Sequence, residues 1–444
     1  MPADRFEPDA YLREETYTQT RAPVEYASTL IPEAYRSPVF FEAERQRVFS
    51  TGWVAVGHVS DIPVSGAVRT VTVAGQSVIV VRDRAGELRA FHNVCRHRAS
   101  RLVTEQSCQL KRFRCPYHSW AYALDGTLLG APLFEGSDIP DDQRAIFDTS
   151  RLPAFDKRNY GLLPVHVAAW ANLVFVSLEP EPMPLTAWLG DLPERLAGYR
   201  LDEMTVVADR SYDIAANWKL IAENFMEYYH LPWVHPELVK VSRVEDHYRF
   251  QGPGLYTGMS TSPISRDTES GWTALTEAPH LADSDAVSGR FIWILPNLAL
   301  SVLPNHVFTV LATPMAHDRT VERTTIALPP HTADDPSIAP ALDELAAFWD
   351  HVNGEDIAIV ERVQEGISSE AYTGGRMCFR FEEPLHRFQN MLIDRMVGLE
   401  RIPAGDGDDP MFASPAADAT GSQTAARSRS SAASRSSMSS MPVE

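Results

Sequence analysis

The sequence predicts an α+β fold with two domains, because segments with strand periodicity are followed by segments with helical periodicity. Its 444 residues and 44% hydrophobic content are enough for two packed cores. Between residues 68 and 165, short apolar segments separated by turns such as Asp125-Gly126 predict a small antiparallel β domain. Further on, residues 289–328 have the pattern of long strands, and residues 218–230 and 340–366 have helical spacing. The second domain should therefore be an antiparallel sheet with helices packed on one side.

Changes in composition set the predicted domain boundaries. Residues 1–38 are polar and interrupted by prolines, which indicates an N-terminal extension, and an entry helix opens a first domain at 39–166. The second domain covers 167–404. Residues 405–444 are rich in Ser, Ala, Arg and Asp without periodicity, so we expect a disordered tail there.

The charge and the cysteine count exclude several classes of protein. Asp and Glu outnumber Lys and Arg by 59 to 40, and the net charge of −19 disfavours nucleic-acid binding. An acidic surface suits a cationic ligand, although solubility alone also explains it. There is no signal-peptide core, and no stretch approaches the ~20 apolar residues of a membrane span, so we expect a cytoplasmic protein without membrane contact. Four cysteines are too few for a disulfide framework and point to metal or redox use.

The most specific motif consists of two short metal-binding arms. Cys95-x-His97 and Cys115-x-x-His118 each lie in a loop between expected strands. Two thiolates and two imidazoles at this spacing suit two kinds of site. In a [2Fe–2S] centre with mixed ligands, the cysteines bind one iron and the histidines bind the other. In a Cys2His2 zinc site, all four residues surround a single ion.

The residues around the arms distinguish these two sites. Residues 91–100 (FHNVCRHRAS) and 114–122 (RCPYHSWAY), with Asp125-Gly126, resemble the two cluster loops of Rieske iron–sulfur domains in ring-hydroxylating oxygenases. The resemblance implies a [2Fe–2S] Rieske cluster held by the four residues of the arms rather than a zinc ion. Cys108 matches no position of the family and, like Cys378, is interpreted as a structural thiol.

A second candidate metal site starts near the end of the first long helix. Helical spacing places Glu223, Glu227 and His230 on one face, a pattern that a solvent-facing side of a helix also explains. Pro232 should end the helix, which lets His235 fold back beside His230. Two imidazoles with open coordination positions suit non-haem Fe(II), but this facial site needs one carboxylate more.

Asp356 is the candidate for that carboxylate. At 100° per residue, it lies in the middle of an apolar stripe of the helix at 340–366, whereas Glu355 lies at the edge of the stripe. The stripe consists of Val352, Ile359, Val360, Val363 and Ile367. A carboxylate among inward-facing apolar side chains is costly unless it is paired or bound to a metal, so Asp356 is the better ligand candidate.

These segments resemble the catalytic domain of the same oxygenases, in which an acid-x-x-His-x4-His stretch and a distant Asp bind a mononuclear iron. The resemblance runs from about residue 32 to residue 399 and implies a catalytic domain of the helix-grip type. Carried over position by position, it makes His230, His235 and Asp356 the iron ligands. Glu227 becomes the acid that links the two metal sites, and Glu at this position is similar to the carnitine-oxygenase branch.

The resemblance also implies a division of labour between the two cofactors. The cluster takes single electrons from a reductase or ferredoxin, and the ferrous iron activates O2 beside a small-molecule substrate. The sequence has no Gly-rich dinucleotide fingerprint, so the electrons must come from another protein. Members of the family often form head-to-tail homotrimers. In such a trimer, Glu227 would bridge His230 and a cluster histidine, His118 or His97, across the interface.

Three functions are compatible with these sites. A pure electron carrier would have no use for residues 170–400, and a ring-hydroxylating dioxygenase acting on an aromatic compound is the second function. We favour the third, a monooxygenase that hydroxylates or N-demethylates a quaternary ammonium compound. Residues 91–100 and 223–236 look most like the choline, betaine and carnitine oxygenases. The candidates for an aromatic substrate pocket, which also fit a hydrophobic core, are Trp233, Phe291 and Trp293.

Overall fold

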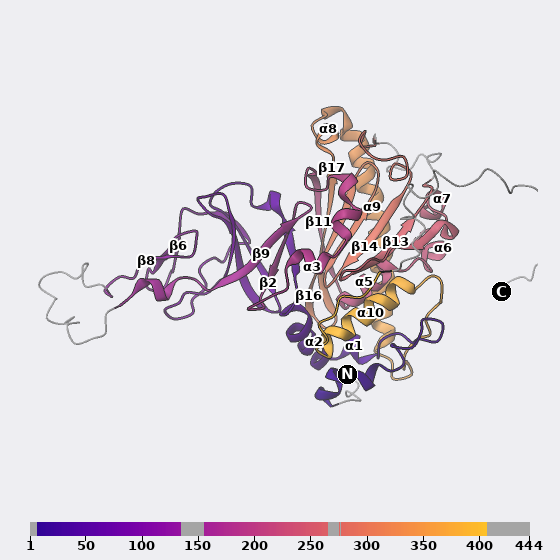
Figure 1. The fold of residues 1–444 in the computed structure, drawn as a ribbon, viewed down its shortest axis with the longest axis horizontal. Helices are drawn as coiled ribbons and strands as arrows, with labels where there is room; N and C mark the ends of the chain where they lie inside the picture. The colour runs from indigo at the N-terminus through magenta and orange to yellow at the C-terminus, as the bar shows by residue number, and fades with distance from the viewer. Residues whose placement is uncertain (1–6, 135–154, 265–274, 276, 406–444) are drawn as a thin grey trace, which may run out of the picture. The chain divides into compact units, whose positions relative to one another are not determined.

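The computed structural model describes residues 7–134, 155–264, 275 and 277–405 (Figure 1). The tail predicted at 405–444 falls outside these residues from 406 onwards. As predicted, the fold consists of antiparallel sheets and helices. Within the described ranges, no helix is long and apolar enough to cross a lipid bilayer.

The first domain has a seven-stranded antiparallel sheet in the order β1-β10-β9-β4-β3-β2-β5 and a three-stranded sheet in the order β6-β7-β8. The strands are β1 (Val54–His58), β2 (Ala67–Val73), β3 (Gln76–Arg82), β4 (Leu88–His92), β5 (Ser107–Gln109), β6 (Phe113–Arg114), β7 (Ala121–Tyr122), β8 (Leu128–Gly130), β9 (Pro164–Trp170) and β10 (Leu173–Ser177). The larger sheet extends past the boundary predicted at residue 166, because β10 pairs with both β1 and β9. The pattern within a strand does not reveal its partner strands.

The second domain contains a seven-stranded antiparallel sheet in the order β11-β17-β16-β15-β14-β13-β12. The strands are β11 (Thr205–Ile214), β12 (His247–Arg249), β13 (Tyr256–Thr261), β14 (Gly289–Ile294), β15 (Leu298–Val302), β16 (Val307–Ala316) and β17 (Arg319–Leu328). Pro314 lies inside β16. The register of β16 against β17 shifts between Pro314 and Ala316, which accommodates a residue that cannot donate a ladder hydrogen bond.

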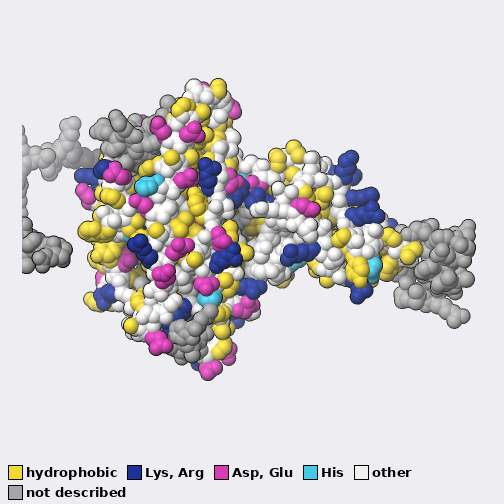
Figure 2. All heavy atoms as spheres, turned by 180° about the vertical axis from the view of Figure 1, so that it is seen from behind, with side chains coloured by type: hydrophobic (Ala, Val, Ile, Leu, Met, Phe, Trp, Pro, Cys, Tyr) yellow, Lys and Arg dark blue, Asp and Glu magenta, His cyan; other side chains and the backbone are white. Residues whose placement is uncertain are grey.

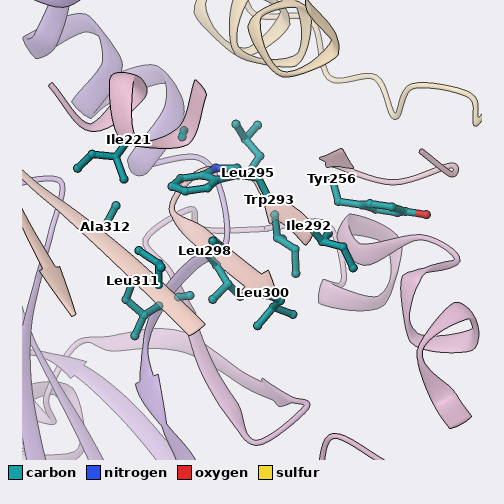
Figure 3. Close-up of a cluster of buried hydrophobic side chains, with 14 of the residues drawn as sticks. Ile221, Tyr256, Ile292, Trp293, Leu295, Leu298, Leu300, Leu311 and Ala312 are labelled. Carbon is teal, nitrogen blue, oxygen red and sulfur yellow. The ribbon is translucent and has the colours of Figure 1, made fainter. Parts of the chain in front are cut away.

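Three helices pack on one face of the second sheet: α5 (Trp218–Met226), α9 (Ala339–Ile367) and α10 (Glu383–Met396) (Figure 1). Figure 3 shows part of the core between them and the strands, with Ile221 of α5 above Ala312 of β16 and the ring of Trp293 of β14 to one side. Each large apolar side chain buried here contributes roughly 1.5–3 kcal/mol to folding. This core therefore holds α5 and α9 in fixed positions above the sheet.

The N-terminal extension is part of the core rather than a peripheral arm. Tyr11, Tyr17 and Tyr35 are at most 2% exposed, and Arg21 forms an ion pair of 2.6 Å with Asp394 of α10. The remaining short helices are η1 (Pro8–Leu12), η2 (Glu14–Tyr17), α1 (Glu33–Arg36), α2 (Pro38–Glu44), η3 (Arg45–Phe49), η4 (Val59–Asp61), η6 (Lys157–Tyr160), α3 (Leu185–Leu189), α4 (Leu192–Arg195), η7 (Ala197–Tyr199), α6 (Leu231–Val234), α7 (Leu238–Val241), η8 (Val244–Asp246), α8 (Pro330–Ala333) and η10 (Pro336–Ile338).

Glu223 of α5 links the extension to α10. Its Oε1 accepts hydrogen bonds from Tyr35 Oη at 2.8 Å and from Gln389 Nε2 at 2.9 Å. Burial raises the pKa of Glu223 from 4.5 to about 7 although both hydrogen bonds lower it. Glu223 therefore helps to pack the extension against α5 and α10, and it does not share a functional face with Glu227 and His230 as expected.

Glu223→Gln should make folding stability less dependent on pH. Because the pKa of Glu223 is higher in the folded chain, the folded chain binds more protons between pH 4.5 and about 7, and this group loses stability as the pH rises through that window. Glutamine has no such loss. The variant should therefore gain about 1–3 kcal/mol relative to wild type between pH 4.5 and pH 8, measured by urea unfolding. Glu237→Gln, an exposed control, should show no such gain in stability. If the free energy of unfolding depends on pH in the same way in wild type and Glu223→Gln, the prediction is contradicted.

Candidate metal centres

The two arms of the first centre lie in loops with the same backbone path. After β4, the Ala99 N–H donates to the Cys95 carbonyl at 3.0 Å, and after β6, the Ser119 N–H donates to the Cys115 carbonyl at 3.1 Å. Each cysteine N–H donates at 2.8 Å to the carbonyl of the residue five positions further on. Ala99 and Ser119 both have a left-handed backbone, with φ of 56° and 57°. Two loops of one shape therefore each present one cysteine and one histidine.

The four side chains of the arms converge. Cys95 and Cys115 are each 2% exposed and form no disulfide, and the ring centroids of His97 and His118 are 4.5 Å apart. Burial raises the pKa of the Cys95 thiol, whereas for Cys115 hydrogen bonds from the backbone N–H groups of His118 and Tyr117 outweigh burial and lower the pKa overall. A lower pKa favours the thiolate, which is the form that binds iron.

Unpartnered polar atoms and aromatic contacts support a bound group at this centre. The buried Nδ1 of His97 has no hydrogen-bond partner among the described residues, and a buried polar atom is normally bonded to something. Trp120 stacks on the His97 ring at 5.0 Å, and Tyr122 Oη lies 3.3 Å from Cys95 Sγ. The donor set and its fixed orientation fit a mixed cysteine–histidine cluster.

The second centre begins where α5 ends. The helix ends at Met226 rather than at His230 as predicted, because Glu227 is extended, with φ −102° and ψ 155°. The Glu227 carboxylate accepts the N–H groups of Tyr229 and His230, which a continuing helix would have used. The short helix α6 follows and brings His235 back beside His230, with ring centroids 5.2 Å apart.

Asp356 of α9 completes the second centre. Its Oδ1 lies 3.7 Å from His230 Nε2 and 2.8 Å from His235 Nε2. The candidate ligand atoms of the three residues all lie within 4.8 Å of one another. His235 is buried, whereas Asp356 and His230 are partly exposed. Two imidazoles and one carboxylate in this arrangement can share one metal ion and leave coordination positions open.

Two further carboxylates orient the imidazoles. Glu227 Oε1 contacts Nδ1 of His230, and Glu355 Oε2 lies 2.8 Å from Nδ1 of His235. A proton held on each Nδ1 leaves each Nε2 free to face Asp356. Burial lowers the pKa of His235, but Asp356 and Glu355 outweigh burial and raise it overall. The carboxylates thus stabilise positive charge here, which fits a metal cation. Glu355 therefore orients His235, a role that its place at the edge of the predicted apolar stripe did not reveal.

The buried face of α9 differs from the predicted apolar stripe. Val363 is 43% exposed, while Asn353 and Gln364 are buried. Asn353 Nδ2 donates to Glu322 Oε1 of β17 at 2.7 Å, and Gln364 Oε1 accepts the backbone N–H of Asn217 at 2.9 Å. These amides take buried positions because each has a partner there, and a hydrophobicity pattern does not show such partners.

A small cavity lies beside Asp356, between α5, α9 and the sheet. Its lining residues are Ile214, Ile221, Asn224, Phe225, Trp293, Val310, Glu322, Asn353, Asp356, Ile357 and Val360. Glu322 is not among the site residues predicted from the sequence, and the one signal for it is an acid at an inward-facing position of β17. A larger hollow of about 740 Å³ between residues of both domains contains none of the candidate ligands, and we assign it no role.

The three aromatic residues predicted for a substrate pocket lie in different places. Trp293 lines the cavity, and the ring of Phe291 lies 6.5 Å from that of Phe225, which also lines it. Trp233 does not line the cavity: it is 79% exposed, because Leu231 is the buried residue of α6. Trp233 is therefore not part of the cavity beside Asp356, contrary to the prediction.

Comparison with known proteins identifies both domains. Residues 52–141 match the Rieske [2Fe-2S] domain, and residues 201–398 match the ring hydroxylating alpha subunit (catalytic domain). The glycine betaine monooxygenase oxygenase subunit of Chromohalobacter salexigens is 30% identical over 404 residues, covering 82% of this chain and 84% of that protein. Chloroplastic choline monooxygenase of Arabidopsis thaliana is 29% identical over 390 residues, covering 84% of each chain. The solved structure of the quaternary ammonium Rieske monooxygenase CntA has a TM-score of 0.71 and 24% identity, covering 88% of this chain and 99% of that chain.

The chain belongs to the Rieske non-haem iron oxygenases, as an alpha subunit. It is an oxidoreductase with one Rieske [2Fe–2S] cluster and one mononuclear iron, so the predicted fold class and cofactors are confirmed. The enzyme requires an electron-transfer partner and O2, and it acts on a small-molecule substrate. Because both domains match, the alternative interpretations as a zinc site and as a pure electron carrier are rejected.

Asp356→Ala should lose the mononuclear iron and all oxygen chemistry while the cluster spectrum stays intact, because two imidazoles alone hold Fe(II) weakly. Glu355→Gln should keep the iron with roughly 10–100-fold lower affinity, since it removes the carboxylate that orients His235. Iron analysis and the electron paramagnetic resonance signal of the reduced cluster measure both effects. Glu365→Gln, on the exposed side of α9, is the control. Loss of iron in Glu355→Ala with full activity in Asp356→Ala would show that the wrong acid has been assigned.

Proposed function

We propose that this protein is the oxygenase component of an enzyme that hydroxylates or N-demethylates a small quaternary ammonium compound. The observation that carries the proposal is the similarity, over four-fifths of the chain, to subunits named glycine betaine monooxygenase and choline monooxygenase. A carnitine monooxygenase oxygenase subunit of Acinetobacter pittii is 25% identical over 340 residues, covering 75% of this chain. A chain with both centres has the parts that such a reaction requires.

The residues of the two centres have separate roles in this proposal. The proposed ligands are Cys95, His97, Cys115 and His118 for the cluster and His230, His235 and Asp356 for the mononuclear iron. When bound, the cluster supplies single electrons and the iron activates O2. Glu227 and Glu355 keep a proton on Nδ1 of their histidines, so that each Nε2 remains available to the metal.

The cavity beside Asp356 is the proposed place of the substrate. Phe225 and Trp293 line it, with ring centroids 6.2 Å apart. A quaternary ammonium group has no N–H to donate, so its recognition depends on aromatic faces and negative charge. Each cation–π contact contributes roughly 0.5–2 kcal/mol, with the higher values in sites that exclude water.

Trimethylammonium compounds should bind and turn over in preference to neutral aromatics. The measurement is a competition titration of choline, glycine betaine and carnitine against naphthalene and a benzoate ester, followed by coupled O2 uptake and product mass. A generic ferredoxin and reductase supply the electrons. Coupled turnover of an aromatic compound with no response to any ammonium compound would instead favour a ring-hydroxylating dioxygenase. Naphthalene 1,2-dioxygenase from Rhodococcus has a TM-score of 0.67 at 20% identity, which shows a shared fold alone.

We also propose that the chains assemble head to tail as a homotrimer, so that the cluster of one chain faces the mononuclear iron of the next. Exposed apolar side chains accompany both centres, and such groups of residues are typical of interfaces. They are Tyr117, Leu129, Leu133 and Phe134 in the first domain and Tyr229, Trp233 and Phe379 in the second. Residues 96–114 contain six basic residues and one acidic residue, and Figure 2 shows Lys and Arg gathered over the end of the first domain. This basic end suits an acidic neighbour.

Glu227→Gln should keep both metals and the trimer but slow turnover at least about 10-fold, because the charge that fixes His230 is lost. The readouts are iron content, sedimentation mass, and the rate at which substrate and O2 reoxidise the reduced cluster in a single turnover. Glu237→Gln, exposed immediately before α7, is the control. A reoxidation rate near wild type in Glu227→Gln would rule out a role of this acid between the two centres.

A further inference from the structure

The cavity beside the second centre contains a buried acid that the oxygen chemistry does not use. Glu322 lies on β17, opposite Ala312 of β16 and Tyr212 of β11, and is 1% exposed. Its side chain lines the same cavity as Asp356. It is neither a candidate ligand nor a hydrogen-bond partner of either histidine in the structure.

Glu322 is buried without a cation. Its one hydrogen-bonding partner is Asn353, whose neutral amide donates to Oε1 at 2.7 Å, and within the described residues no Lys, Arg or His forms an ion pair with it. Burial and the nearby charge of Asp356 together raise the pKa of Glu322 to about 7, although the hydrogen bond from Asn353 lowers it. A buried carboxylate is costly unless a positive charge compensates it. Among the described residues, no cationic side chain compensates a negative charge on Glu322.

Aromatic rings form other parts of the cavity wall. Phe225 of α5 and Trp293 of β14 both line it, and Figure 3 shows Trp293 among the buried side chains beneath α5. Trp293 Nε1 donates to the carbonyl of Pro296 at 2.9 Å. Its N–H is therefore already used, and the ring offers a ligand its π surface. Two carboxylates, two rings and, among the residues that line the cavity, no cationic side chain are the features that attract a cation without hydrogen-bond donors.

We propose that Glu322 is the counterion that selects the cationic headgroup of the substrate, with Phe225 and Trp293 as the aromatic walls beside it. This inference rests on the proposed function, because it names the residue that would distinguish an ammonium compound from a neutral one. Asn353 donates a hydrogen bond to one oxygen of Glu322, and the preference for a cation rests on the charge of the carboxylate rather than on that bond.

The other explanation of Glu322 is a structural one, in which its bond to Asn353 merely fastens α9 to the sheet. The two roles respond differently to substitution. Glu322→Gln keeps an acceptor for Asn353 and almost the same volume but removes the charge. Asn353→Ala removes the bond but keeps the charge. Glu223→Gln is the matched control, since Glu223 is also a buried acid with a pKa raised to about 7 but does not line the cavity.

The experiment compares ammonium compounds with their carbon isosteres on the iron-loaded enzyme. The pairs are choline with 3,3-dimethylbutan-1-ol and glycine betaine with 3,3-dimethylbutanoate. The ratio of the two dissociation constants in each pair measures the preference for positive charge. We expect this preference to fall by roughly 10- to 100-fold in Glu322→Gln and to stay near the wild-type value in Asn353→Ala and Glu223→Gln. Iron content is measured for every variant.

Each result decides between the two roles. An unchanged preference in iron-loaded Glu322→Gln would overturn the proposal and leave the proposed function standing. A wild-type enzyme that binds none of the ammonium compounds better than its isostere would overturn both. If Glu322→Gln fails to hold iron, Asn353→Ala decides: a retained preference supports the counterion, and a lost preference supports the structural role.

Discussion

The packing of α9 against the rest of the catalytic domain is the constraint on which the second centre depends. Three polar side chains on this helix each bond a different neighbour. They are Asn353 with Glu322, Glu355 with His235, and Gln364 with Asn217. Because a slip of one residue would turn every side chain by 100°, these bonds can form together in one register alone. That register places Asp356 opposite two histidines that lie more than a hundred residues earlier in the chain.

The position of α5 is fixed from its other side by buried charges. Lys219 of α5 and Glu44 of α2 form an ion pair of 2.7 Å in which both side chains are fully buried. Removing one partner of such a pair typically costs roughly 3–5 kcal/mol. Together with the bonds from Tyr35 and Gln389 to Glu223, this pair makes the N-terminal segments part of the support of the iron site.

The two centres differ in how they reach their geometry and in their charge. The ligands of the cluster come from two compact loops whose shape is set by hydrogen bonds over four or five residues. The second centre draws on α5, α6 and α9 and is surrounded by carboxylates, whereas the cluster loops are basic. The net charge of −19 is thus unevenly distributed, and the basic end is the part suited to acidic partners.

The sequence by itself determined the features that depend on short spacing: the two cysteine–histidine arms, the acid-x-x-His-x4-His stretch, and the α+β class from strand and helix periods. It also indicated Asp356, because the phase of one long helix makes an inward-facing acid conspicuous. Tertiary structure alone decided that α5 ends at Met226, that β10 belongs to the first sheet and that Trp233 is exposed. It also gave Glu355 and Glu322 their neighbours. These features depend on contacts between distant segments, and the energy of a buried charge is set by those neighbours rather than by local spacing.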